Sequence, residues 1–370
     1  AVKLIKGPKG SKVILTLKRV DGTIEDLMIP RDEIELEETY AKSSIVKKDN
    51  RQFGVINLPK FYISFEDVNS RNATTDVKRE IQRLKKQGMD GLVLDLRNNG
   101  GGSLKTVVDI GGLFIQEGPI VQVRSTGSDR EVLRDRDKSV EWEGPLVILV
   151  NEFSASASEI LAAAMQDYKR AIIIGSAQTY GKGTVQNIID LNRMVRNNTN
   201  GDMGALKFTT QKYYRINGGS TQLEGVKSDV IVPNRYTYVD MGERDQDNPL
   251  PWDEIEPATY ELWKSSIDYE TTIERSRKRM AQSPEMKLID ENAKWIKKVR
   301  SKKLYSLKYQ IYEANLKRSE EESKRFESLS DYESTLSFES LPYELPIMEN
   351  DSVFKKNRRR WHETLKQDIY

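Results

Sequence analysis

The amino-acid sequence predicts an α/β fold with a mainly parallel sheet, because short apolar runs alternate with segments of helical periodicity. The runs "GLVLDLR" at 91–97 and "PLVILV" at 145–150 are almost continuously apolar, which is typical of parallel strands buried on both faces. Residues 72–88 repeat apolar side chains at helical spacing, and residues 158–168 are rich in alanine, leucine and methionine, which favour helix. We therefore expect a buried sheet covered by helices.

The remaining elements of the predicted core continue this alternation. "FGVINLP" at 53–59 and "YISF" at 62–65 are predicted to form a pair of strands. A glycine-rich turn then leads to a predicted helix at 104–115. The run 171–175 is short and β-branched, which indicates another buried strand.

A hairpin is predicted after this core. Residues 205–216 and 229–233 are rich in strand-forming side chains, and the dipeptide Asn217-Gly218 between them is a strong hairpin signal.

The two ends of the chain differ from the core. Residues 1–37 predict the end of a helix, a Gly-Pro turn and two strands. A polar, proline-containing linker follows the core, and residues 258–329 are dense in glutamate, lysine, arginine and leucine at helical spacing. The basic run "KKNRRR" at 355–360 is interpreted as a solvated charged face. We predict a separate, mostly helical C-terminal domain over 246–370.

Composition excludes several classes of function. The net charge of the 370 residues is +2, and no block of like charge is long enough to act as a nucleic-acid-binding arm. No apolar run reaches membrane-spanning length. There is no cysteine, which excludes a cysteine nucleophile and fits both an oxidising compartment and chance. The single histidine, His362, lies in the charged tail, so a Ser-His-Asp triad would have to recruit that tail.

A serine and a lysine offer another route to nucleophilic catalysis. "SASAS" at 154–158 lies where a buried strand turns into a helix, which exposes a hydroxyl beside a helix N-terminus. Lys182 lies between two glycines, and burial that lowers its pKa would make it a base. The alternative is a small-residue helix cap and an ordinary loop lysine. Spacing alone favours that alternative.

Longer motifs change this balance. "LVLDLRNNGGGSL" at 92–104, "SASASEI" at 154–160, "AAAMQDY" at 162–168 and "YGKGTVQ" at 180–186 occur in the order found in the C-terminal processing (tail-specific) proteases, which the chain resembles. That family consists of serine endopeptidases with a Ser/Lys dyad. Two further segments indicate its long bacterial branch: "KYYRINGGSTQLEGVKSDVIVP" at 212–233 and "NPLPWDEIEPATY" at 248–260.

The resemblance implies a role for individual residues. It assigns the nucleophile to Ser156 rather than to Ser154 or Ser158, and the general base to Lys182. Gln186 would orient the lysine. The oxyanion donors would be the backbone amides of Ala157 and of either Gly101 or Gly102, between which the sequence does not choose. The loop "GSAQTYG" before the lysine is one residue longer than is usual in the family, so the motif rather than the count places Lys182.

The resemblance also implies the setting of this core. It makes 1–37 the last part of a PDZ domain, and 38–245 a catalytic core of the crotonase/Clp-protease type. It implies polypeptide substrates with apolar C-terminal tails, no cofactor and no metal, and peripheral or no membrane contact. We expect a piece of a longer exported protein in the bacterial periplasm, with any adaptor protein unknown.

Competing interpretations of the motifs are weaker. "GSAQTYGKGT" resembles a phosphate-binding loop, but five residues separate its glycines and Gly183 replaces the required Ser/Thr. Asp167 lies about 16 Å along the helix from Ser156, so we expect it to serve helix packing or an ion pair. A non-catalytic binding module, similar to the repeats of retinoid-binding proteins of the photoreceptor matrix, would not need the dyad with Gln186. A crotonase-like acyl-oxyanion enzyme would not need the dyad either.

Overall fold

The computed structural model describes residues 2–18, 24–31, 39–64, 70–195, 201–265 and 267–369. The chain forms two compact units, residues 1–39 and 40–370. We describe each unit by itself.

The first unit is a small antiparallel sheet. Helix α1 (Val2–Ile5) precedes strands β1 (Lys12–Lys18) and β2 (Ile24–Pro30), which pair along their whole length. The Arg31 side chain ties the unit together, donating to the backbone oxygens of Leu4, Ile5 and Lys12. The predicted helix end and two strands are therefore confirmed as far as the described residues extend.

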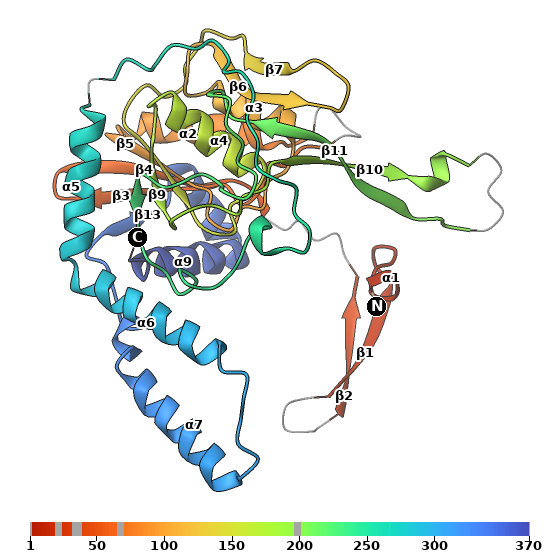
Figure 1. Ribbon diagram of the computed structural model, residues 1–370, viewed down its shortest axis with the longest axis vertical. Helices are drawn as coiled ribbons and strands as arrows, with labels where there is room; N and C mark the ends of the chain where they lie inside the picture. Colours follow the sequence, from red (N-terminus) through yellow and green to blue (C-terminus); the bar gives the residue numbers. More distant parts are fainter. Residues whose placement is uncertain are drawn as a thin grey trace. The chain divides into compact units, whose positions relative to one another are not determined.

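The second unit is built on a seven-stranded sheet of order β12-β9-β8-β5-β4-β3-β13. Figure 1 labels β3, β4, β5, β9 and β13 of this sheet. Its middle is parallel from β4 to β12, whereas β3 and β13 pair antiparallel at one edge. The predicted mainly parallel sheet is confirmed. The strands are β3 (Lys42–Lys48), β4 (Arg51–Asn57), β5 (Gly91–Asp95), β8 (Leu146–Val150), β9 (Ile172–Gly175), β12 (Val230–Ile231) and β13 (Ser337–Glu339).

The predicted partner of β4 is wrong. Residues 62–64 form no strand, and Phe65 lies outside the described residues. Strand β3 pairs with β4 instead, and the segment after β4 crosses to the glycine-rich turn, where Phe61 forms a single bridge with Gly102. The segment therefore helps to shape the end of the sheet rather than to extend it.

A second, antiparallel sheet has the order β10-β11-β6-β7. The predicted hairpin at 205–233 is wrong, because its two strands join different sheets. The turn at 215–219 forms, with Arg215 N–H donating to Gly219 O at 2.8 Å, but the chain then crosses over and β12 pairs with β9. The strands of this sheet are β6 (Gly118–Arg124), β7 (Glu131–Asp135), β10 (Thr184–Asp190) and β11 (Ala205–Tyr214).

Three helices pack on the core. Helix α2 (Ala73–Lys86) is amphipathic and is capped by Asn72. Helix α3 (Leu104–Gly111) is capped by Ser103 and ends four residues before the predicted limit at 115. Helix α4 (Ala157–Asp167) is buried along nearly its whole length, which its alanines permit because they let neighbouring elements approach closely.

The C-terminal region is mostly helical, as predicted. It also supplies β13 to the main sheet, and His362 on the last helix lies within 3.3 Å of Ser44 Oγ on β3. No helix among the described residues is long and apolar enough to span a membrane. The helices are α5 (Tyr269–Gln282), α6 (Pro284–Arg300), α7 (Tyr309–Lys324), α8 (Leu345–Asn350) and α9 (Ser352–Lys366). Short 3₁₀ turns lie at Leu191–Arg193, Glu243–Asp245, Glu327–Leu329 and Pro342–Glu344.

The fold class predicted from the sequence is thus confirmed. A small PDZ-like antiparallel sheet precedes a mainly parallel α/β core, and a mostly helical region follows. The predicted domain limits at 37/38 and 245/246 stay predictions.

Candidate active site

Two turns meet at the carboxyl ends of neighbouring parallel strands, as sites do in this class of fold. Strand β5 leads into the turn "RNNGGG" and β8 leads into "NEFSAS". Two hydrogen bonds join the turns. Asn98 N–H donates to the side-chain oxygen Oδ1 of Asn151 at 2.9 Å. Ala155 N–H donates to the backbone oxygen of Asn99 at 3.0 Å. The two turns therefore share one edge of the sheet.

Ser156 occupies a strained position at the end of the second turn. Its backbone lies at φ 57° and ψ −114°, in a region that non-glycine residues rarely adopt and that is common at functional sites. It immediately precedes α4, and its side chain is partly exposed. Ala157, the first residue of α4, has no acceptor within the helix for its N–H group. A reactive hydroxyl would thus lie beside a free helix N-terminus.

The two candidate oxyanion glycines differ in the use of their N–H groups. Gly101 N–H donates to the buried Asn99 Oδ1 at 2.9 Å. Gly102 N–H has no acceptor among the described residues, because the bridge to Phe61 uses Gly101 O and Ser103 N–H. Gly102 lines the cavity that contains Ser156. Gly101 is needed for close approach, since a Cβ there would lie 2.8 Å from Ser156 Cβ.

The carboxylate of Glu159 joins the turn of Ser156 to the loop of Lys182. It is fully buried in the first turn of α4 and accepts hydrogen bonds from Ser156 N–H at 2.7 Å, Gly181 N–H at 2.6 Å and Lys182 N–H at 3.1 Å. The Thr179 hydroxyl donates to the same carboxylate at 2.7 Å. Burial raises the pKa of Glu159 to about 7, and the four donors oppose that shift.

Lys182 is held by its backbone and leaves its amine in the cavity. Its carbonyl accepts hydrogen bonds from the hydroxyls of Tyr213 and Thr221. Its Nζ lies 3.3 Å from Gln186 Oε1 on β10, to which it donates. The preceding Gly181 has φ +90°, and a Cβ there would lie 3.0 Å from the Leu223 backbone, so the loop needs glycine.

The cavity around these groups has a volume of about 170 Å³. Burial of Lys182 is the main reason that its pKa falls below the ordinary lysine value, and the neighbouring ammonium of Lys207 lowers it further. Glu243 and Glu159 act in the opposite direction. The cavity is lined by Gly100, Gly102, Leu104, Ser156, Ala157, Ile160, Lys182, Val185, Gln186, Ile188, Lys207 and Tyr213.

The structure thus brings together Ser156, Ala157, Gly102, Lys182 and Gln186, which the sequence predicted as site residues. Ser156 and Lys182 line one cavity, and among the described residues no hydrogen bond joins Ser156 Oγ to Lys182 Nζ. Such contacts are often loose in structures without substrate.

The neighbouring serines are engaged elsewhere, since Ser154 Oγ donates to Leu96 O at 2.9 Å and Ser158 Oγ donates to Asn99 O at 2.8 Å.

Two residues considered in the sequence lie away from this cavity. His362 packs on β3 beside Ser44, and burial lowers its pKa to about 4. Asp167 forms a largely buried ion pair with Arg215, with 2.5 Å between Asp167 Oδ1 and Arg215 Nη2. The expectation that Asp167 serves an ion pair is confirmed.

Sequence reasoning missed three contributors to the site. Glu159 was not predicted as a site residue, although a glutamate three residues after a serine cap is a recognisable capping signal. Tyr213 and Lys207 come from β11, on the far side of a long connection. No local pattern links these two residues to Ser156.

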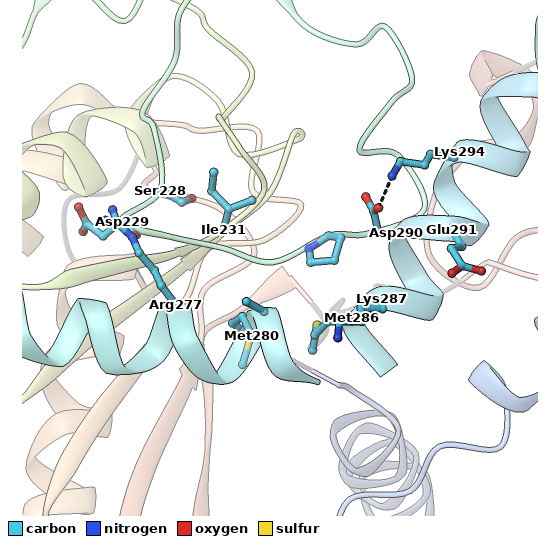
Figure 2. Close-up of a pocket in the computed structure, with 12 residues that line it drawn as sticks. Ser228, Asp229, Ile231, Arg277, Met280, Met286, Lys287, Asp290, Glu291 and Lys294 are labelled. Carbon is cyan, nitrogen blue, oxygen red and sulfur yellow. Dashed lines mark hydrogen bonds and ion pairs between the residues drawn. The ribbon is translucent and has the colours of Figure 1, made fainter. Parts of the chain in front are cut away.

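A larger cavity lies elsewhere, between β12 and helices α5 and α6, with a volume of about 590 Å³ (Figure 2). Two of its carboxylates already have partners: Asp229 accepts from Gln166, Ile173 N–H and Tyr269, and Asp290 pairs with Lys294 at 2.7 Å. Among the described residues, no group of three or more His, Cys, Asp or Glu side chains could hold a metal ion. The smaller cavity is therefore the candidate active site.

Replacement of Asp167 tests whether its role is structural. Asp167→Ala leaves Arg215 as an uncompensated, largely buried charge and should cost about 3–5 kcal/mol of stability. The double variant Asp167→Ala/Arg215→Met should recover part of that loss. Thermal unfolding measures both, and a double variant less stable than Asp167→Ala would contradict the ion-pair role.

Replacement of Glu159 tests the buried carboxylate. Because folding raises its pKa to about 7, its contribution to stability is full below the unfolded pKa and falls as pH rises through 7. A rise of this pKa from 4.5 to about 7 corresponds to about 3 kcal/mol. In Glu159→Gln this loss of stability between about pH 4.5 and 7.5 should be absent. Urea unfolding across that range, compared with the unchanged chain, measures the difference; parallel pH dependences would refute it.

Comparisons with known proteins agree with the geometry. The family model "Peptidase family S41" matches residues 52–232, and the model "C-terminal domain of tail specific protease" matches residues 236–370. The chain is 38% identical over 336 residues to the "Tail-specific protease" of Haemophilus influenzae, covering 89% of this chain and 46% of that relative. It is 34% identical over 231 residues to the "Carboxy-terminal processing protease CtpA" of Bacillus subtilis, covering 62% of this chain and 44% of that relative.

A solved "Photosystem II D1 C-terminal processing protease" matches with a TM-score of 0.44 at 28% identity, covering 61% of this chain and 56% of that one. The chain spans about half the length of the curated relatives it matches. The family predicted from the motifs is confirmed: the chain belongs to peptidase family S41 and carries the C-terminal domain of the tail-specific proteases.

Proposed function

We propose that this protein is a serine endopeptidase that cuts polypeptides near their C-terminal tails with a Ser156/Lys182 dyad. One observation carries the proposal: a strained serine at a helix N-terminus and a lysine with a lowered pKa line one cavity. The buried Glu159 carboxylate holds the backbones of both in place.

In the proposed reaction, neutral Lys182 takes the proton of Ser156 Oγ, which attacks the carbonyl carbon of the scissile peptide bond. The negative charge moves to the carbonyl oxygen. As this tetrahedral intermediate collapses, the C–N bond breaks and the lysine ammonium returns the proton to the leaving amine. Water, deprotonated by the same lysine, then hydrolyses the acyl-enzyme and restores the serine.

The oxyanion donors in this mechanism are the N–H groups of Ala157 and Gly102. Both lie on the cavity, and neither has an acceptor among the described residues. Gly101 is a poorer candidate because its N–H group already donates to Asn99. Two backbone donors placed before the charge develops stabilise the intermediate more than water would.

Gln186 suits the role of orienting Lys182 because it is uncharged. A carboxylate at 3.3 Å would favour the ammonium and raise the lysine pKa, whereas an amide oxygen positions the amine without adding charge. The ammonium of Lys207 lowers the pKa of Lys182, as burial does.

We further propose substrates with apolar C-terminal tails and a periplasmic location, which the branch of the family supports. The "Tail-specific protease" of Haemophilus influenzae is the relative whose alignment covers 89% of this chain. Under this proposal, residues 1–37 end a PDZ domain, 38–245 form the catalytic core and 246–370 form the helical domain. A non-catalytic binding module would have no use for the lowered lysine pKa.

Removal of either dyad member tests the function. Ser156→Ala and Lys182→Ala should each lower kcat/KM for an unstructured, apolar-ended polypeptide by at least about 10³-fold, and the double variant should lose little more, because nucleophile and base act as a unit. Ser128→Ala and Lys227→Ala, at exposed positions outside the cavity, are matched controls. Turnover that persists in folded Lys182→Ala would remove the dyad.

The pH dependence of kcat/KM provides a separate test. Lys182 accepts a proton only when neutral, so activity should rise with pH through its lowered pKa. Since folding lowers this pKa, the stability contributed by the site is present above the unfolded pKa and is lost as pH falls through the folded one. A short unstructured peptide assayed from the acid side of neutrality to alkaline pH gives the profile; a flat or falling profile through neutrality would exclude a neutral lysine base.

A further inference from the structure

A second lysine, Lys207, lines the cavity of Ser156, and it neither gives nor takes a proton in the proposed reaction. It lies on β11, opposite Ile188 of β10 in the antiparallel pairing. Directly opposed residues of such a pair face the same side of the sheet, so Lys207 shares the cavity side with Ile188. Figure 1 shows β10 and β11 as a two-stranded arm that extends beyond the core. Lys207 therefore belongs to the wall of the candidate active site that this arm provides.

The ammonium of Lys207 is available to a ligand. Its side chain is exposed, and no residue that the structure describes forms an ion pair or a hydrogen bond with it. Lys212, further along the same strand, is engaged instead, with its Nζ 2.9 Å from Asp253 Oδ1. An unpaired lysine on the wall of a substrate cavity can accept a carboxylate that the substrate brings.

The charged side chains that line the cavity are all positive. They are Lys182 and Lys207, and no aspartate or glutamate is among the described lining residues. Glu159 is fully buried, and its two oxygens already accept four hydrogen bonds. Because Lys182 is neutral when it takes the serine proton, Lys207 provides the positive charge that remains during the attack. The cavity thus complements an anionic group on the substrate.

Apolar side chains surround this charge. Ile188, which is 70% exposed, lines the cavity together with Leu104, Ile160 and Val185. Apolar walls screen an ion pair less than open water does, so the charge of Lys207 acts more strongly here than on an open surface. The volume of about 170 Å³ admits only a short part of a polypeptide. A carboxylate that meets Lys207 therefore lies close to the scissile bond.

We propose that Lys207 is a specificity-determining residue that favours substrates with a carboxylate next to the scissile peptide bond. An acidic side chain and the free end of the substrate chain present the same group to the ammonium, so either source fits. The inference rests on the proposed peptidase function, since it concerns the part of the substrate that enters the cavity of Ser156.

Peptide binding to the Ser156→Ala variant tests the inference without turnover. Fluorescence anisotropy with labelled, unstructured, apolar-ended peptides gives the Kd. One set of amidated peptides exchanges glutamine for glutamate at successive positions. A second set with neutral side chains is shortened stepwise and compares a free acid with an amide at each length. The set that responds identifies the source of the carboxylate.

In at least one set the carboxylate should lower the Kd about fivefold at low salt, as expected for a partly exposed ion pair. Raising the salt should reduce this preference, because salt screens exposed charges. Adding Lys207→Met should reduce the preference to less than about twofold. Adding Lys207→Glu should make the neutral peptide the tighter binder.

The matched control is Lys303→Met, which removes the same charge from an exposed lysine outside the cavity and should keep the preference. Equal Kd values for acidic and neutral peptides in both sets would overturn the inference, and so would a preference that survives Lys207→Met.

A cleavage assay on the unchanged chain separates this inference from the proposed function. Cleavage without a carboxylate preference would leave the peptidase in place and remove the role of Lys207. A carboxylate preference in binding without any cleavage would remove the peptidase and keep the role of Lys207.

Discussion

The buried carboxylate of Glu159 is the interaction on which the candidate site depends. Three backbone N–H groups and one hydroxyl converge on its two oxygens, from the turn of Ser156, the loop of Lys182 and Thr179. A fully buried carboxylate without hydrogen-bond donors would destabilise the fold strongly. The loops that carry these donors must therefore keep their N–H groups directed at Glu159. Glu159 thereby fixes the backbones of the proposed nucleophile and base without touching either reacting atom.

The surrounding sheets serve this arrangement. Parallel strands β5 and β8 end side by side, which delivers the glycine-rich turn and the turn of Ser156 to one edge. Strands β10 and β11 of the second sheet add Gln186, Lys207 and Tyr213 from the other side. The resulting enclosure is tight enough to lower the pKa of Lys182 yet leaves the helix N-terminus open to a substrate carbonyl.

Much of the candidate site was visible in the sequence, but not the way its parts interact. The resemblance to the C-terminal processing proteases places Ser156, Lys182 and Gln186, whereas spacing alone favours a helix cap and an ordinary loop lysine. The choice between Gly101 and Gly102 was not visible, since it depends on whether an N–H group meets Asn99 or the cavity. The contribution of Lys207 was not visible either, because the pairing of β10 with β11 that places Lys207 opposite Ile188 joins strands separated by a long connection.

The sequence by itself determined that β4, β5, β8 and β9 are strands and that α2, α3 and α4 are helices, because buried strands and amphipathic helices differ in local periodicity. Tertiary structure alone decided which strands pair. Strand β4 pairs with β3 rather than with the segment after β4. Strands β11 and β12 belong to different sheets despite the tight turn after β11. Strand propensity depends on the neighbours that a strand packs against. The neighbours that are available to a strand depend on how the whole chain folds, and no local run of residues encodes them.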